Sequence, residues 1–107
     1  MRLVIIESPY AGDVDFNLRY LRACMRDCLV RGEAPYASHA LYTQEGVLDD
    51  TDPAEREHGI QAGFAWRSAA QATIVYLDLG ISKGMDYGIA HAKRGSRPVE
   101  YRTLGFW

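Results

Sequence analysis

The chain has 107 residues, of which 48% are hydrophobic and 24% are charged, and its formal net charge is −2. This composition predicts a single folded domain over residues 1–107 and excludes a chain that stays disordered. The slight excess of acidic residues argues against a general nucleic-acid binder, which normally presents a basic face. Because the apolar runs are too short for a membrane span or a signal peptide, we expect a cytoplasmic protein.

The first predicted strand is the apolar, β-branched run at residues 2–7, which ends abruptly at a turn over residues 8–13. Within this turn, Pro9 keeps the residue before it extended, and Gly12 can adopt a left-handed conformation. Asp13 or Asp15 can then cap a helix that runs to about residue 31, because apolar residues recur along it at helical spacing.

The cysteines and histidines do not form a predicted metal site. Cys24 and Cys28 lie four residues apart on this helix, and two thiols are half the ligands of a structural zinc site. The three histidines show no ligand spacing, although His39, at the end of a predicted strand, can approach the ligand crevice. We therefore expect buried, reduced cysteines, no metal and no cofactor.

The middle of the chain contains a second predicted strand, an acidic loop and a helix. The strand and the loop leaving it are assigned to residues 36–42, which are apolar and poor in helix signals. Residues 43–52 carry a glycine and four acidic residues and form an exposed loop, which can serve as a lid. The next helix begins with Asp52 as its N-cap, Pro53 at its first position and Glu55 in a capping box, and continues to about residue 70.

A glycine turn joins a strand at residues 72–77 to a helix that starts near Ser82 or Lys83 and ends at Gly95. The backbone N–H groups at such a helix start are unpaired and lie at the positive end of the helix dipole, so they favour an anion. Lys83 strengthens this interpretation, because a cation in the first turn opposes the dipole unless an anion lies between them. The alternative is an ordinary strand-to-helix turn with a solvated lysine.

Strands and helices alternate along the chain, and the last strand is predicted at residues 98–102. This order predicts a three-layer α/β/α fold with a four- to five-stranded, mainly parallel sheet of the flavodoxin or Rossmann type. In a flavodoxin-like strand order, the turns at residues 8–13 and 79–84 flank the switch point, where neighbouring strand ends open into a crevice. We therefore expect both turns to face one ligand.

Several segments of the chain resemble the nucleoside 2-deoxyribosyltransferase-like superfamily, which includes the 2′-deoxynucleoside 5′-phosphate N-hydrolases. The matching pieces are residues 5–12 (IIESPYAG), Asn17, residues 78–85 (DLGISKGM), residues 88–92 (GIAHA) and residues 95–99 (GSRPV). Within the superfamily the chain is most similar to short proteins that bacteriophages often carry. The resemblance implies cleavage or transfer at the N-glycosidic bond of a nucleoside or nucleoside 5′-monophosphate, and a homo-oligomer.

The resemblance also implies a set of ligand-binding residues. In the superfamily the first turn and the glycine-serine turn hold the sugar and, in the members that use one, the 5′-phosphate. Carried over to this sequence, the substrate-binding residues are Ser8, Pro9, Tyr10, Ala11, Gly12, Asn17, Gly80, Ser82, Lys83, Gly84 and Met85. For Tyr10 the alternatives are contact with the ligand and packing in the core.

The sequence departs from the superfamily at the reacting carboxylate. The superfamily uses a glutamate in the helix after the second turn, which attacks the anomeric carbon through an oxocarbenium-like transition state. Counting back from residues 95–98 puts that glutamate at position 88, which is Gly88 here. The remaining catalytic candidates are Asp78 at a strand end, Asp86 about 200° around the helix from position 88, and Glu7. Each of the three also has an ordinary structural explanation.

Two functions follow from these observations. The first is an N-glycosidase or deoxyribosyltransferase acting on a nucleoside or nucleotide. The second is a non-catalytic nucleotide-binding or sensing protein that keeps the phosphate turns but lacks the glutamate. A purely structural protein ranks last, because it leaves Lys83 and the glycine turn without a purpose.

Overall fold

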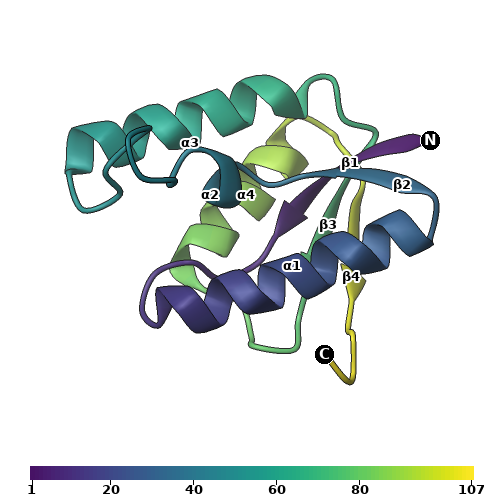
Figure 1. Cartoon of the computed structure of the whole chain (residues 1–107). Coiled ribbons are helices and arrows are strands. Elements are labelled where there is room, and N and C mark those ends of the chain that lie inside the picture. The colour runs from purple at the N-terminus through teal and green to yellow at the C-terminus, as the bar shows by residue number, and fades with distance from the viewer.

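A four-stranded, all-parallel sheet forms the centre of the computed structural model, which describes residues 1–107 (Figure 1). The strands lie in the order β2-β1-β3-β4 and comprise β1 (Arg2–Glu7), β2 (Glu33–Tyr36), β3 (Ala72–Tyr76) and β4 (Val99–Arg102). From β1 the chain moves to one side to form β2, and it then returns to the other side to form β3 and β4. The switch point therefore lies between the carboxyl ends of β1 and β3.

Helices cover both faces of this sheet. Helix α1 (Val14–Val30) packs on one face, while α3 (Pro53–Arg67) and α4 (Lys83–Arg94) lie on the other (Figure 1). A single helical turn, α2 (Ser38–Leu41), follows β2 and contacts α3. The predicted three-layer α/β architecture with four to five parallel strands is confirmed.

Two apolar clusters hold the layers together. On the α1 side, Ile6 and Ile74 pack with Tyr20 and Cys24, and all four are buried. On the α4 side the sheet contributes Val75, which packs against buried residues of α4. Because the two central strands, β1 and β3, are covered on both faces, apolar residues follow one another along them instead of alternating with polar ones.

The predicted helix caps are present, with one difference. The Asp13 carboxylate accepts a hydrogen bond of 3.2 Å from the Phe16 N–H at the start of α1. Asp52 caps α3 through the Ala54 N–H at 3.2 Å. The expected capping box does not close, because Glu55 accepts a hydrogen bond from the Asp49 N–H in the preceding loop instead of from Asp52.

The prediction for the second strand was wrong in its position. Strand β2 ends at Tyr36, where the prediction began, and residues 38–41 form the helical turn α2. Pro35 masks the strand in the sequence, because proline cannot donate to a ladder. Strand β2 is an edge strand paired only with β1, so a missing N–H on its free side is tolerated.

Candidate functional site

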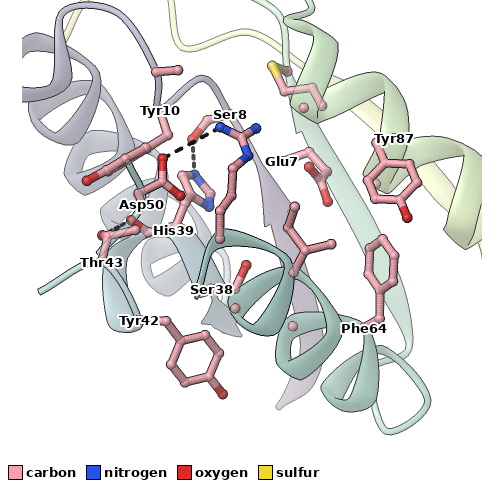
Figure 2. A pocket seen from close by; sticks show the side chains of 18 of the residues that line it. Glu7, Ser8, Tyr10, Ser38, His39, Tyr42, Thr43, Asp50, Phe64 and Tyr87 are labelled. Carbon is pink, nitrogen blue, oxygen red and sulfur yellow. Dashed lines mark hydrogen bonds and ion pairs between the residues drawn. The ribbon is translucent and has the colours of Figure 1, made fainter. Parts of the chain in front are cut away.

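A pocket of about 360 Å³ lies at the switch point, against the carboxyl end of β1. Its wall is formed by β1 and the turn after it, by α2 and α3, and by the first turns of α4. Figure 2 shows Tyr10 and Asp50 on one side of the pocket, with Phe64 and Tyr87 on the other. The two turns that we expected to face one ligand thus line one pocket.

The structure brings most of the predicted site residues to this pocket and leaves the others outside it. Those in its wall are Glu7, Ser8, Tyr10, Ala11, Ser82, Lys83, Gly84 and Met85, together with Gly88. Those outside its wall are Pro9, Gly12, Asn17, Asp78, Gly80 and Asp86.

Asn17 and Asp86 are two of the predicted site residues that lie outside the pocket wall. The Asn17 side-chain amide donates hydrogen bonds of 3.0 and 3.1 Å to the backbone carbonyls of Tyr10 and Ala11. Asn17 therefore holds the first turn in shape without lining the pocket. Asp86 is exposed on α4 and makes no hydrogen bond or ion pair through its carboxylate.

The Asp78 carboxylate is engaged by α1 and the C-terminal segment instead of the pocket. It accepts hydrogen bonds from the Tyr20 hydroxyl at 2.6 Å, from the Leu104 N–H at 2.9 Å and from the Gly105 N–H at 3.1 Å. Burial raises the pKa of Asp78, but these hydrogen bonds outweigh it and hold the pKa below its ordinary value. The contacts of Asp78 are those of a structural clamp.

Glu7 is the buried carboxylate of the pocket wall. Its side chain is 13% exposed, and its Oε2 accepts a hydrogen bond of 2.8 Å from Arg67 Nη2. Burial raises the pKa of Glu7 to about 7, although the hydrogen bond and the charge of Arg67 oppose this shift. Glu7 therefore gains or loses its proton near neutral pH, which is a property of carboxylates in acid–base and nucleophilic chemistry.

Gly88 lies directly against this carboxylate. A Cβ atom at position 88 would lie 2.6 Å from the carboxyl carbon of Glu7 and 2.7 Å from its Oε1. Real atoms do not approach so closely, so a side chain at position 88 and the present position of Glu7 exclude each other. The Glu7 carboxylate thus occupies the space that a side chain from α4 would fill.

A serine–histidine pair lies beside Glu7. Ser8 Oγ and His39 Nε2 are 2.8 Å apart, and both residues line the pocket (Figure 2). Burial lowers the pKa of His39 to about 4, so the ring is neutral at physiological pH. A neutral ring with a bonded hydroxyl presents donors and acceptors suited to a ligand hydroxyl or a base edge.

Two cationic side chains lie where the pocket meets the N-terminus of α4, with the carboxylate of Asp50 beside one of them. Lys83 and Arg56 both line the pocket, and Arg56 Nη1 lies 3.6 Å from Asp50 Oδ2 in an ion pair. A Cβ atom at Gly84 would lie 3.8 Å from Arg56 Nη2, so the guanidinium reaches across to the first turn of α4. This end of the pocket is suited to an anionic group.

A family model described as "Domain of unknown function (DUF7768)" matches residues 2–102 of the chain. The chain belongs to this family. A search of curated proteins finds no match. Among solved structures, the fold is similar to that of the 2-deoxyribosyltransferase of the psychrotolerant bacterium Bacillus psychrosaccharolyticus. The TM-score is 0.72, with 11% identity over 94% of this chain and 72% of that one.

This likeness establishes the shared fold, which is the fold that the resemblance in the sequence pointed to. The solved relative is described as a biocatalyst for the synthesis of nucleosides. In the DUF7768 chain no helix combines the length and the apolar character that a membrane span requires.

Sequence reasoning missed the contribution of α3 to the pocket in the DUF7768 chain, which includes Arg56, Phe64 and Arg67. Apolar residues recur only weakly at helical spacing along α3, so the sequence did not show which of its faces meets the pocket. One signal pointed indirectly to Arg67. A glutamate that ends a buried strand requires a cationic partner, but several arginines were available and the sequence did not distinguish among them.

Proposed function

We propose that this DUF7768 protein cleaves, or exchanges the base at, the N-glycosidic bond of a nucleoside or nucleoside 5′-monophosphate, with Glu7 as the reacting carboxylate. One observation carries the proposal. The Glu7 carboxylate lies in the space beside Gly88, at the position of the helix where the superfamily resemblance places the reacting glutamate. The carboxylate is thus supplied by strand β1 instead of helix α4. The similar fold of a 2-deoxyribosyltransferase supports the same chemistry.

The proposed reaction has two displacement steps. In the first, Oε1 of ionised Glu7 forms a bond to the anomeric carbon while the bond from that carbon to the base nitrogen breaks. The electron pair leaves with the base, which takes a proton from solvent water. In the second step, water or the nitrogen of another base attacks the anomeric carbon, its proton passes to solvent, and the Glu7 carboxylate is released. With a pKa of about 7, a substantial fraction of Glu7 is ionised at neutral pH.

The pocket has room and groups for each part of such a ligand. Its volume of about 360 Å³ is at the small end of the usual range for ligand pockets. Phe64 and Tyr87, whose ring centroids are 5.3 Å apart, give an apolar wall for the base. Lys83 and Arg56 lie at the end suited to a 5′-phosphate.

The test is an incubation of the purified protein with ribo- and deoxyribonucleosides and their 5′-monophosphates, with free base measured by chromatography. We expect base release that falls at least ~100-fold in Glu7→Gln. Glu57→Gln is the matched control, because Glu57 is exposed on the same helix as Arg67 and bonds only to Gln61. Base release that persists in Glu7→Gln but is lost in Asp86→Asn would transfer the role to Asp86.

A relocation experiment tests the same proposal in the opposite direction. The double variant Glu7→Gly/Gly88→Glu removes the carboxylate from β1 and restores one to α4, in the same volume beside Arg67. Recovery of base release relative to Glu7→Gly alone would support one shared position for the carboxylate. A double variant that folds, binds nucleotide and stays as inactive as the single variant would contradict it.

The second candidate function is a non-catalytic nucleotide-binding protein. The pairing of Glu7 Oε2 with Arg67 favours this candidate, because a paired carboxylate is a weaker nucleophile. Its signature is a rise in melting temperature with a nucleoside monophosphate and no release of base, since a ligand stabilises only the state that binds it.

We retain a homo-oligomer as part of the proposal on the superfamily resemblance, and light scattering of the purified protein tests it.

A further inference from the structure

The contact between Glu7 and Arg67 joins strand β1 to the end of α3 on the floor of the pocket. We propose that Arg67 is the positioning residue for Glu7, which holds Oε2 so that Oε1 is the atom that faces the ligand. This inference rests on the proposed function for the reaction itself, but the contact and its effect on Glu7 are measurable without any substrate.

Arg67 is fixed at two points of its guanidinium group. Its Nη1 donates a hydrogen bond of 2.7 Å to Thr73 Oγ1 on β3, and its Nη2 donates one of 2.8 Å to Glu7 Oε2. The side chain is 4% exposed, and its guanidinium carbon lies 5.6 Å from the centre of the Phe64 ring. A planar group held in this way allows one direction for the bond to Glu7.

The second oxygen of Glu7 is left free. Oε1 makes no hydrogen bond, whereas Oε2 is bonded to Arg67. Two buried side-chain polar atoms lack a hydrogen-bond partner, Arg67 Nε and His91 Nδ1. Oε1 of Glu7 also lacks a partner but is not one of these two, so it is not fully buried. Because Glu7 lines the pocket, Oε1 is accessible from there.

The unpartnered Nε of Arg67 supports a functional role over a purely structural one. A buried donor without an acceptor destabilises the folded state, and buried ion pairs are a weak source of stability in general. Apolar residues at both positions 7 and 67 would fill this space without either penalty. The arrangement is explained if the guanidinium serves the carboxylate.

Arg67 is the charged group in direct contact with Glu7. Helix α4 presents Gly88 to the carboxylate, and α2 presents the neutral His39, which bonds to Ser8. On the neighbouring part of α4, His91 stacks on Phe64, and burial together with nearby arginines lowers its pKa. Lys83 and Arg56 line the pocket near the α4 N-terminus. Removal of the Arg67 charge therefore acts on Glu7 more than any other single change.

The test compares Arg67→Met, which removes the charge, with Arg67→Lys, which keeps the charge but loses the planar guanidinium group and its two fixed N–H donors. The side-chain carboxyl of Glu7 is followed by NMR in protein labelled with 13C-glutamate, and its signal is identified by its absence in Glu7→Gln. In Arg67→Met we expect the titration of Glu7 to move to higher pH by about 1 to 3 pH units, as expected for loss of an adjacent opposite charge. In Arg67→Lys we expect a titration close to that of the unmodified protein.

Activity provides the second readout. In Arg67→Met the acid limb of the pH profile of kcat should move to higher pH, together with the titration of Glu7. In Arg67→Lys the limb should stay in place while kcat falls and KM changes little, because Oε2 is no longer held in one direction. Should Arg67→Met unfold, Thr73→Val releases Nη1 and leaves the charge, and its expected result is that of Arg67→Lys.

The outcomes separate this inference from the proposed function. An unchanged Glu7 titration in folded Arg67→Met would overturn the role of Arg67, even if the protein releases base. A shifted titration in a protein that releases no base would support the contact and reject the N-glycosidase. An Arg67→Lys variant with unaltered kcat would overturn the claim that the guanidinium group positions Oε2.

Discussion

The raised pKa of Glu7 lowers the stability of the folded protein at the pH values where the proposed chemistry needs an ionised carboxylate. Burial raises its pKa from the ordinary 4.5 to about 7, with Arg67 opposing the shift in part. Between these two pH values the folded state binds a proton that the unfolded chain has released. The free energy of unfolding must therefore fall as the pH rises from 4.5 to 7, because deprotonation favours the unfolded state.

Glu7→Gln should remove this pH dependence, because a glutamine is neutral throughout. We expect the variant to lose less stability than the unmodified protein between pH 5 and pH 8, by about 1 to 3 kcal/mol. Urea denaturation at both pH values measures the difference, with Glu57→Gln as the control. Parallel pH profiles for Glu7→Gln and the unmodified protein would contradict a raised pKa at Glu7.

Lys83 offers a second prediction for a single residue. It lines the pocket in the first turn of α4, where a ligand phosphate is proposed to lie. Lys83→Glu should weaken the binding of a nucleoside monophosphate by about 10- to 100-fold, because its phosphate meets the reversed charge. The binding of the matching nucleoside, which has no phosphate, should weaken much less. Lys93→Glu, at the far end of the same helix, is the control. Equal effects on both ligands in calorimetric titration would remove the phosphate from the proposal.

Helix α4 combines a favourable N-terminus with one buried position, Gly88, that has no room for a side chain. Gly88 is in the interior of the helix, where alanine would ordinarily be more favourable by about 1 kcal/mol. At this position, however, the added Cβ would lie 2.6 Å from the carboxyl carbon of Glu7. The close approach of α4 to β1 therefore depends on a residue with no side chain.

Gly88→Ala should destabilise the protein by about 1 to 3 kcal/mol in spite of the better helix propensity. It should also reduce base release, because the Glu7 carboxyl group must move. Gly84→Ala is the matched control for stability, since its Cβ would meet only Arg56 Nη2, at 3.8 Å. Thermal denaturation of both variants measures the effect, and a Gly88→Ala variant as stable as Gly84→Ala would show that Glu7 moves freely.

At the scale of the whole molecule, Asp78 joins β3, α1 and the C-terminal segment. Its carboxylate accepts hydrogen bonds from Tyr20 and from the Leu104 and Gly105 N–H groups. Beyond them, Trp107 packs on Phe16 and Tyr20 with ring centroids about 5 Å apart. The end of the chain is thereby held against α1.

Asp78→Asn should destabilise the fold by about 1 to 3 kcal/mol, because an amide accepts these hydrogen bonds less well than a charged carboxylate. The native pKa of Asp78 is below its ordinary value, so its contribution is present above that ordinary value and is lost as the pH falls further. The difference between Asp78→Asn and the unmodified protein should therefore shrink in acid denaturation series. Loss of base release at unchanged stability would instead return Asp78 to the catalytic candidates.

Much of the fold could be predicted because its signals are local. The helix starts near Asp13, Asp52 and Ser82 were recognised, since a capping side chain bonds to an N–H only two or three residues away. Alternation of apolar runs with helical periodicity predicted the parallel sheet, because parallel strands require crossover connections. The second strand was misplaced since only its position at the sheet edge explains Pro35.

The sequence by itself determined the alternation of strands and helices, the class of fold and the two turns of the site. The tertiary structure alone decided which carboxylate enters the pocket, which one clamps the C-terminal segment, and which arginine meets Glu7. Arg67 and Glu7 are 60 residues apart along the chain, and their contact depends on how α3 crosses the sheet. Local patterns act through neighbouring backbone groups, whereas a contact of this kind exists only once separate layers have packed together.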